Sequence, residues 1–285
     1  MSKVWFVTGS ARGLGRDIVE AALAAGDRVV ATARDPSRLA DLVAQHGDRV
    51  RAVELDVTDA VAAQAAVRAA LDAFGRIDVL VNNAGFGRFS PFEQTSEAEF
   101  REQIDANFYG VVNVTRAALP SLVAQRSGYI FHISSVGGRL GSPGLSAYQA
   151  AKWAVGGFTE VLRGEVGPLG VKVTAVEPGG MRTDWGPDSM RDMPEPLPQY
   201  VGLFEGLKAL RERYIGNEAG DPKKVAQILV ALAGHDDPPA HLLLGSDALQ
   251  YAGAAQNVRA AAEETWRTVS ASSDFAAPSI PPLPR

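Results

Sequence analysis

The stretch from Val4 to Ala25 restricts the possible folds of this chain more than any other part of the sequence. Val4 to Val7 is a short apolar run typical of a buried strand, Thr8 to Gly15 is rich in glycine, and apolar residues at helical spacing follow until Gly26. This order can bind phosphate, because glycine lets the backbone approach a diphosphate and a helix N-terminus presents free N–H groups. Glycine can also serve only the geometry of the turn, so the rest of the chain has to decide.

The composition argues against several classes of protein. A chain of 285 residues, 46% of them hydrophobic, is long enough for one large α/β domain or two small ones. The net charge of −5, without a basic block, argues against a nucleic-acid partner. There is no cysteine, and the four histidines lack a paired metal-binding spacing, so we expect neither a disulfide nor a metal site. Met1 to Lys3 leads directly into the first strand and no apolar run is long enough for a bilayer, so we expect a cytoplasmic protein without a membrane partner.

Strand-like and helix-like segments alternate along most of the chain. Strands are expected at 4–7, 28–33, 50–55, 77–81, 129–133, 171–176 and 241–244, with helices between them. Thr58 and Ser96 are the expected N-caps of two of these helices, and a bend is expected near Gly110. The alternation predicts one doubly wound, Rossmann-type α/β domain over residues 1–273, with a seven-stranded, mostly parallel sheet, helices on both faces and right-handed crossovers.

Three later segments have their own expected roles. Residues 181–220 are irregular, with a short helix near 204–213, and are expected to form a substrate lid. Residues 248–273 are expected to form a C-terminal helix. Residues 274–285 contain Pro278, Pro281, Pro282 and Pro284 and predict an extended tail.

Polar and glycine residues follow the expected strands at one edge of the sheet. Ligands of parallel α/β sheets bind at the carboxyl ends of the strands. The residues at these ends are Thr8, Gly9, Arg34, Asp56, Asn82, Ser135 and Pro178. Their convergence favours a binding site over a purely structural role for the glycine turn.

Tyr148 and Lys152 stand four residues apart on one predicted helix, so their side chains share a face. A neighbouring ammonium group favours phenolate and lowers the pKa of tyrosine, which suits proton transfer near neutral pH. Ser135 lies where its hydroxyl can bond the same substrate oxygen, and Asn107 lies on the helix before that strand. Each residue can also have a purely structural role. Tyr148 and Lys152 can form the rim of an amphipathic helix, Ser135 can stabilise a turn, and Asn107 can be a buried asparagine that binds the backbone.

Together these motifs resemble the short-chain dehydrogenases/reductases of the compact, single-domain branch, and the front of the chain is similar to steroid-dehydrogenase-like and carbonyl reductase members. The resemblance covers roughly residues 4–245. It rests, in family order, on Thr8-Gly9-Ser10-Ala11-Arg12-Gly13-Leu14-Gly15, Asp56-Val57, Asn82-Asn83-Ala84-Gly85, Asn107, Ser135, Tyr148-x-x-x-Lys152 and Pro178-Gly179.

The resemblance implies a role for each matching residue. Tyr148 is the implied general acid/base, Lys152 lowers its pKa and holds the nicotinamide ribose, Ser135 polarises the carbonyl, and Asn107 holds a water in a proton relay. The implied cofactor-binding residues are Gly9, Ser10, Arg12, Gly13, Leu14, Gly15, Arg34, Asp56, Val57, Asn82, Asn83, Ala84, Gly85, Tyr148, Lys152, Pro178, Gly179 and Thr183. The implied substrate walls are Phe86, Val136, Leu145, Gly180 and Trp185, with Met190, Met193 and Tyr200 adding adaptable surface unless they form the core of the lid.

The charged residues near the end of the second expected strand favour NADP(H) over NAD(H) as the cofactor. An NAD site has an acidic residue at the end of the second strand, where this chain has Ala33 and Arg34. Arg34 and Arg12 can bind a 2′-phosphate, although Asp35 argues the other way.

The mostly apolar walls indicate a hydrophobic ketone or secondary alcohol as substrate. The resemblance further implies a homodimer or homotetramer through the helices that carry Asn107 and Tyr148. The small residues Ala150, Ala151, Ala154, Gly156 and Gly157 would allow a close approach of the partner.

Several alternatives remain open. One is an NAD-preferring dehydrogenase of the same family. Another is a catalytically silent regulator that senses a dinucleotide, which is disfavoured because the complete set of Asn107, Ser135, Tyr148 and Lys152 is present. An epimerase or dehydratase of the extended branch has a different glycine spacing. A serine hydrolase is disfavoured because the G-x-S-x-G motif is absent.

Overall fold

A computed structural model describes residues 2–191, 193–277 and 279–284. Its centre is a seven-stranded, fully parallel sheet in the order β3-β2-β1-β4-β5-β6-β7. The strands are β1 (Val4–Val7), β2 (Arg28–Ala33), β3 (Val50–Glu54), β4 (Val79–Asn82), β5 (Gly128–Ile133), β6 (Val171–Pro178) and β7 (His241–Leu244). The order reverses between β1 and β4, which is the switch point where such sheets bind ligands. The predicted fold class and all seven strands are confirmed.

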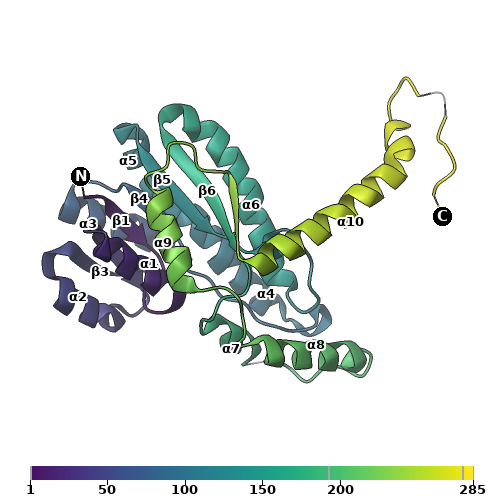
Figure 1. The fold of residues 1–285 in the computed structure, drawn as a ribbon, viewed down its shortest axis with the longest axis horizontal. Helices are drawn as coiled ribbons and strands as arrows, with labels where there is room; N and C mark the ends of the chain where they lie inside the picture. The colour runs from purple at the N-terminus through teal and green to yellow at the C-terminus, as the bar shows by residue number, and fades with distance from the viewer. Residues whose placement is uncertain (1, 192, 278, 285) are drawn as a thin grey trace.

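Two layers of helices cover the sheet (Figure 1). On one face pack α1 (Gly13–Ala24), α2 (Ala40–His46) and α9 (Pro222–Leu232), and on the other α3 (Ala60–Phe74), α5 (Gly110–Gln125) and α6 (Ser146–Val166). Side chains of β1 alternate between the layers, with Trp5 and Val7 in the first core and Phe6 in the second. All three are fully buried, which explains why the strand is continuously apolar.

Side-chain caps set the start of several helices. Ser96 and Glu99 form a complete capping box at α4 (Glu97–Ile104), as the sequence predicts for Ser96. The expectation for Thr58 is wrong: Asp59 caps α3, accepting hydrogen bonds from the backbone N–H groups of Val61 and Ala62. Thr58 instead donates its hydroxyl to Asp56 at 2.7 Å.

The bend expected near Gly110 is a π-helical turn over Asp105–Tyr109, between α4 and α5. Such turns occur often at functional sites because the extra residue redirects a side chain. A Cβ at Gly110 would lie 2.6 Å from Cγ2 of Val57, so the helix after the turn packs tightly on the loop that follows β3. The turn carries Asn107.

The 181–220 segment is more ordered than the sequence indicates. It contains α7 (Trp185–Met190) and α8 (Val201–Tyr214), which lie together outside the two helical layers (Figure 1). The last helix, α10 (Ser246–Ala271), extends away from the sheet, and its outer turns are exposed. The tail follows without regular structure after a short turn, and Pro278 lies outside the described residues. Across the described residues, no helix combines the length and the apolar character needed to cross a membrane.

Candidate active site

A cleft of about 1190 Å³ runs along the carboxyl edge of the sheet and continues beneath α7 and α8. Arg34, which follows β2, and Asp56, which follows β3, line one end, called here the β2 end. Side chains of α6, α7 and α8 line the other, called the α8 end. The predicted catalytic and cofactor-binding residues line this cleft except Ser10 and Asn82, and so do the predicted substrate walls Phe86, Val136, Leu145, Gly180 and Trp185.

Ser10 and Asn82 face the interior of the sheet instead. The Ser10 hydroxyl donates to the Val7 carbonyl at 2.8 Å, and the side chain is fully buried. The Asn82 amide donates to the Thr115 hydroxyl at 2.9 Å. Asn83, the next residue, lines the cleft, and its amide donates to the carbonyls of Thr8 and Gly9. The side chains of Ser10 and Asn82 therefore bond within the sheet and point away from the cleft, and their assignment as cofactor contacts stays a prediction.

The glycine turn fits a diphosphate. Gly9 has a φ of +68°, and a Cβ there would lie 2.9 Å from Cα of Ala84. A Cβ at Gly15 would collide with the Gly9 carbonyl oxygen. No side chain caps the N-terminus of α1, so its first N–H groups remain available to an anion in the cleft. The glycines thus hold strand, turn and helix closer together than any side chain would allow.

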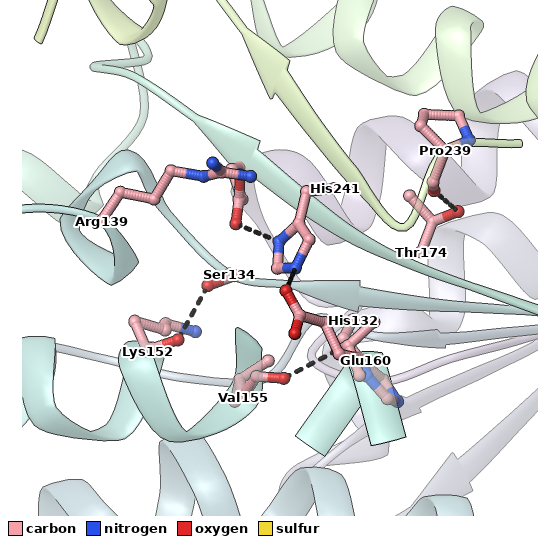
Figure 2. A network of polar contacts seen from close by, with 11 residues as sticks. His132, Ser134, Arg139, Lys152, Val155, Glu160, Thr174, Pro239 and His241 are labelled. Carbon is pink, nitrogen blue, oxygen red and sulfur yellow. Dashed lines mark hydrogen bonds and ion pairs between the residues drawn. The ribbon is translucent and has the colours of Figure 1, made fainter. Parts of the chain in front are cut away.

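Tyr148, Lys152 and Ser135 converge at the base of the cleft. Tyr148 and Lys152 are buried on α6, and the Lys152 ammonium lies 5.5 Å from the centre of the Tyr148 ring. The ammonium donates to the Ile133 carbonyl at 2.8 Å, which fixes it against the end of β5. Ser135 follows β5, and its hydroxyl accepts from the Gly137 N–H at 3.0 Å. The Ser134 hydroxyl instead donates to the Lys152 carbonyl at 3.2 Å (Figure 2).

The protonation of Tyr148 differs from the expectation. Burial raises the pKa of Tyr148 to about 12, although a hydrogen bond with Ser135 and the charge of Arg211 act in the opposite direction. Burial also lowers the pKa of Lys152 to about 8. The removal of both groups from water therefore has more effect than the attraction between phenolate and ammonium, which was the basis of the expectation. In this structure the phenol holds its proton at neutral pH.

Asn107 lies beside Lys152 and has one unused acceptor. Its amide donates to the carbonyls of Phe86 and Gln103, at 2.7 and 2.8 Å. Its buried Oδ1 has no hydrogen-bond partner among the described residues. A Cβ at Gly85 would lie 2.5 Å from this oxygen and 3.7 Å from the Lys152 nitrogen, so both atoms face the same small space. A polar molecule there can bind both.

The cations at the β2 end are arranged differently from the expectation. Arg12 forms ion pairs with Asp184, at 3.5 Å, and with Asp188 of α7, so its guanidinium links the glycine turn to the 181–220 segment. Arg34 and Arg38 line the cleft, and neither makes an ion pair with a described residue. Arg38 was not predicted from the sequence, because a turn of 3₁₀ helix places it at the cleft although it does not directly follow β2.

Two carboxylates at the β2 end, Asp35 and Asp56, form hydrogen bonds with residues close to them in sequence. Asp35 accepts from both the backbone N–H and the hydroxyl of Ser37, which lowers its pKa. Burial acts to raise the pKa of Asp56, but two hydrogen bonds from Thr58 and the charge of Arg34 keep it below its ordinary value. Asp35 argued against a phosphate site in the sequence, but its carboxylate is hydrogen-bonded to Ser37 within the local turn.

Apolar and aromatic side chains form one part of the α8 end. Phe86, Leu145 and Trp185 line it, with Val136 and Gly180 near them, and the Trp185 ring centre lies 5.1 Å from that of Tyr148. Met190, Met193 and Tyr200 do not line the cleft but pack around Phe89, Leu145 and Phe204, so they belong to the core of the 181–220 segment. Further cleft residues could not be named from the sequence; they include Arg88, Ser142, Gln149, Arg211, Tyr214 and Tyr251, and the carboxylates Glu102, Asp105, Asp184, Asp188, Glu218 and Asp247. They come from loops and helices without a local motif.

A buried polar network supports this site from within the sheet. The Thr159 hydroxyl gives its proton to the Val155 carbonyl at 2.7 Å and so accepts from Nδ1 of His132 at 2.8 Å. Nε2 of His132 then accepts from the Thr115 hydroxyl at 3.3 Å. Figure 2 shows His132 below His241 and Glu160. His241 forms hydrogen bonds with Glu160 at 2.8 Å and with Glu177 at 2.7 Å. The network joins β4, β5, α5 and α6 behind Tyr148 and Lys152.

Burial, with a smaller effect of Lys152, lowers the pKa of His132 to about 3. In the unfolded chain this histidine binds a proton below about pH 6.5, whereas in the folded chain it stays neutral, so acid favours unfolding. We expect the stabilisation that His132 provides, relative to the glutamine of the His132→Gln variant, to fall by about 1.4 kcal/mol for each pH unit below 6.5. Denaturant unfolding of both proteins at pH 5 to 7 measures this difference.

The comparison with the variant is needed because His241 acts in the opposite sense. Hydrogen bonding to Glu177 raises the pKa of His241, so its stabilising contribution is present at low pH and is lost as pH rises through that pKa. A stability difference that stays constant between pH 5 and 7 would contradict a neutral, buried His132.

Comparisons with known proteins agree with this geometry. The family model described as short chain dehydrogenase matches residues 3–193. Oxidoreductase BOA17 of Botryotinia fuckeliana is 49% identical over 276 residues, which cover 96% of this chain and 100% of the relative. A short-chain dehydrogenase from Streptomyces avermitilis has a TM-score of 0.89 at 38% identity, covering 96% of this chain and 100% of that one. An alcohol dehydrogenase from the archaeon Thermococcus sibiricus, solved with 5-hydroxy-NADP, has a TM-score of 0.71 at 27% identity, covering 86% of this chain and 97% of that one.

Proposed function

Because this oxidoreductase belongs to the short-chain dehydrogenase/reductase family, we propose that it interconverts a hydrophobic ketone and a secondary alcohol with NADP(H), and that Tyr148 is its general acid/base. The observation that carries the proposal is the convergence of Ser135, Tyr148 and Lys152 at the base of the cleft, beside the glycine turn. Replacement of Tyr148, described in the Discussion, is the experiment that tests it.

Each of the proposed catalytic residues has a separate role that follows from its position. When bound, NADP(H) supplies or accepts the hydride at the carbonyl carbon. Ser135 orients the carbonyl oxygen with its hydroxyl, and Tyr148 gives its proton to that oxygen as negative charge develops there. The raised pKa of Tyr148 supports this direction, because a protonated phenol is the form that reduces a ketone. Lys152 holds the ribose, and Asn107 places a water on the path of the returning proton.

Arg34 and Arg38 are the proposed 2′-phosphate ligands. Both line the β2 end, neither forms an ion pair with a described residue, and Asp35 is bonded to Ser37. Arg12, which the sequence analysis also assigned to the phosphate, links the glycine turn to the 181–220 segment through its pairs with Asp184 and Asp188 instead. The Thermococcus enzyme solved with 5-hydroxy-NADP supports this choice of cofactor.

Gly15 allows a direct test of the proposed diphosphate site. Gly15→Ala places a methyl group against the Gly9 carbonyl and the Asn83 amide, so the turn has to open. We expect this variant to bind NADP⁺ at least about tenfold more weakly, since the loss of one charged hydrogen bond has that size. Fluorescence titration measures it. Gly164→Ala on α6 is the control, because that Cβ meets open space, and it should bind normally; equal binding by both variants would contradict the site.

We further propose that residues 1–273 form one domain and that the 181–220 segment is its substrate lid. Trp185 and α8 already cover Tyr148, which supports a lid that excludes water from the reacting carbonyl.

The proposed partner in solution is a second copy of the chain, in a dimer or tetramer. The small-residue stripe on α6 is only partly available for it, because Ala151 and Gly156 are buried in the chain's own core. Trp153, Gly157 and Val161 are exposed at four-residue spacing and form an outward row. Light scattering at micromolar concentration tests this, and a monomer would contradict it.

A further inference from the structure

Arg211 places a positive charge beside the apolar side chains at the α8 end of the cleft. It is half-buried on α8, and its guanidinium carbon lies 4.9 Å from the Phe89 ring centre and 5.9 Å from that of Trp185. Trp185 packs in turn on Tyr148. The charge of Arg211 acts on the pKa of Tyr148, although less than burial does, so the two groups share this end of the cleft.

The other cations of the cleft explain why this one is unusual. Arg12, Arg88, Arg101 and Arg191 line the cleft as well, and each makes an ion pair with a carboxylate. Among the described residues, no carboxylate lies within ion-pair distance of Arg211, nor of Arg34 and Arg38 at the β2 end. A partly buried cation without a counter-ion is costly to the free protein, and an anionic ligand offsets that cost.

The hydrogen bonds of Arg211 leave its outer edge available. Its Nε donates to the Met190 sulfur at 3.1 Å, and its Nη2 donates to the Ser189 hydroxyl at 2.9 Å. Nη1 and the second N–H of Nη2 have no acceptor among the described residues, and these two nitrogens form an edge that can bind both oxygens of a carboxylate. Ser189 and Met190 hold the guanidinium in place, so little conformational entropy is lost when an anion binds.

Resting on the proposed function, we propose that the substrate is a ketone that carries a carboxylate on its apolar body, and that Arg211 binds this carboxylate while Tyr148 binds the carbonyl oxygen. The apolar walls around Phe86, Leu145 and Trp185 bind the carbon skeleton between the two groups. An apolar ketone without the acid binds the same walls but gives Arg211 no counter-ion, and none of the described residues supplies one. The proposed substrate is therefore the hydrophobic ketone that the cleft walls indicate, with one carboxylate in addition.

Matched acids and esters test the proposal. The substrates are 4-oxo-4-phenylbutanoate and its longer homologues with one and two more methylenes, each beside its methyl ester, with NADPH as the reductant. For at least one chain length we expect wild-type kcat/KM to be about 10- to 100-fold higher for the acid than for the ester, the size of a charged hydrogen-bonded pair. Arg211→Gln should remove this preference by lowering the value for the acid, and Arg211→Lys should restore part of it.

The control is Arg213→Gln, on the same helix but exposed, which should keep the wild-type preference. An equal loss for acid and ester in Arg211→Gln would mean that Arg211 only anchors α8 to α7, and would overturn the proposal; so would a wild-type preference for the esters. If no ketone is reduced with either cofactor, the proposed function fails instead. Calorimetric binding of the acids in the presence of NADP⁺, to wild type and Arg211→Gln, still tests the carboxylate site: wild-type binding lost in the variant supports it, and equal or no binding overturns it.

Discussion

Tyr148→Phe is expected to lower kcat for ketone reduction by about 10² to 10⁴, which is the usual contribution of a positioned acid or base. The substitution removes the only proposed proton donor to the carbonyl oxygen and leaves the ring packed against Trp185. Cofactor binding should be unchanged, because the glycine turn, Arg34 and Arg38 are untouched. Steady-state rates with NADPH measure the first effect, and fluorescence titration measures the second.

Tyr200→Phe is the matched control for that experiment. The Tyr200 hydroxyl donates to Glu93 at 2.8 Å and does not line the cleft, so its loss should leave the rate close to that of the wild type. Normal turnover by Tyr148→Phe would contradict the mechanism, whereas equal losses in both variants would indicate a general defect in packing.

The double variant Arg34→Ala, Arg38→Ala is expected to weaken NADPH binding by about 10- to 100-fold, since one or two charged hydrogen bonds to the 2′-phosphate are lost. NADH lacks this phosphate, so its dissociation constant should stay close to that of the wild type. Fluorescence titration with both cofactors measures the change in preference. The variant should therefore discriminate poorly between the two dinucleotides.

Arg101→Ala is the control, because Arg101 also lines the cleft but is paired with Glu97 at 2.9 Å. It should keep the wild-type preference for NADPH. An unchanged ratio of NADPH to NADH affinity in the Arg34 and Arg38 double variant would remove the argument for NADP(H) and favour the NAD-preferring alternative.

The sheet was predictable because its strands are short, mainly apolar runs separated by helices. The central strands β1 and β4 are buried on both faces, whereas the edge strands β3 and β7 are only partly buried. Boundaries moved where tertiary pairing extends or shortens a strand: β6 continues to Pro178 because β7 pairs beside it, and β4 begins at Val79. The helix α7 was not predicted, since its six residues include a glycine and a proline and show no helical period. Its place is set by Thr183, Trp185 and the ion pair from Arg12 rather than by local preference.

The candidate site was predictable where a motif fixes both residue type and spacing. Tyr148 and Lys152 share a face of α6 by helical geometry alone, and the glycine turn follows β1 directly in sequence. Arg211 has no such signal, because only the packing of α8 over Trp185 brings it to the cleft. The direction of the pKa shift of Tyr148 could not be predicted either, because it depends on burial, which the four-residue spacing to Lys152 does not reveal.

The most direct test of the central claim is the loss of NADPH absorbance by the wild-type protein with a panel of apolar ketones and keto acids, with NADH in parallel. The proposed function predicts turnover that requires the ketone and is faster with NADPH than with NADH. Binding of NADPH without turnover of any ketone would contradict it and would favour a protein that senses the dinucleotide.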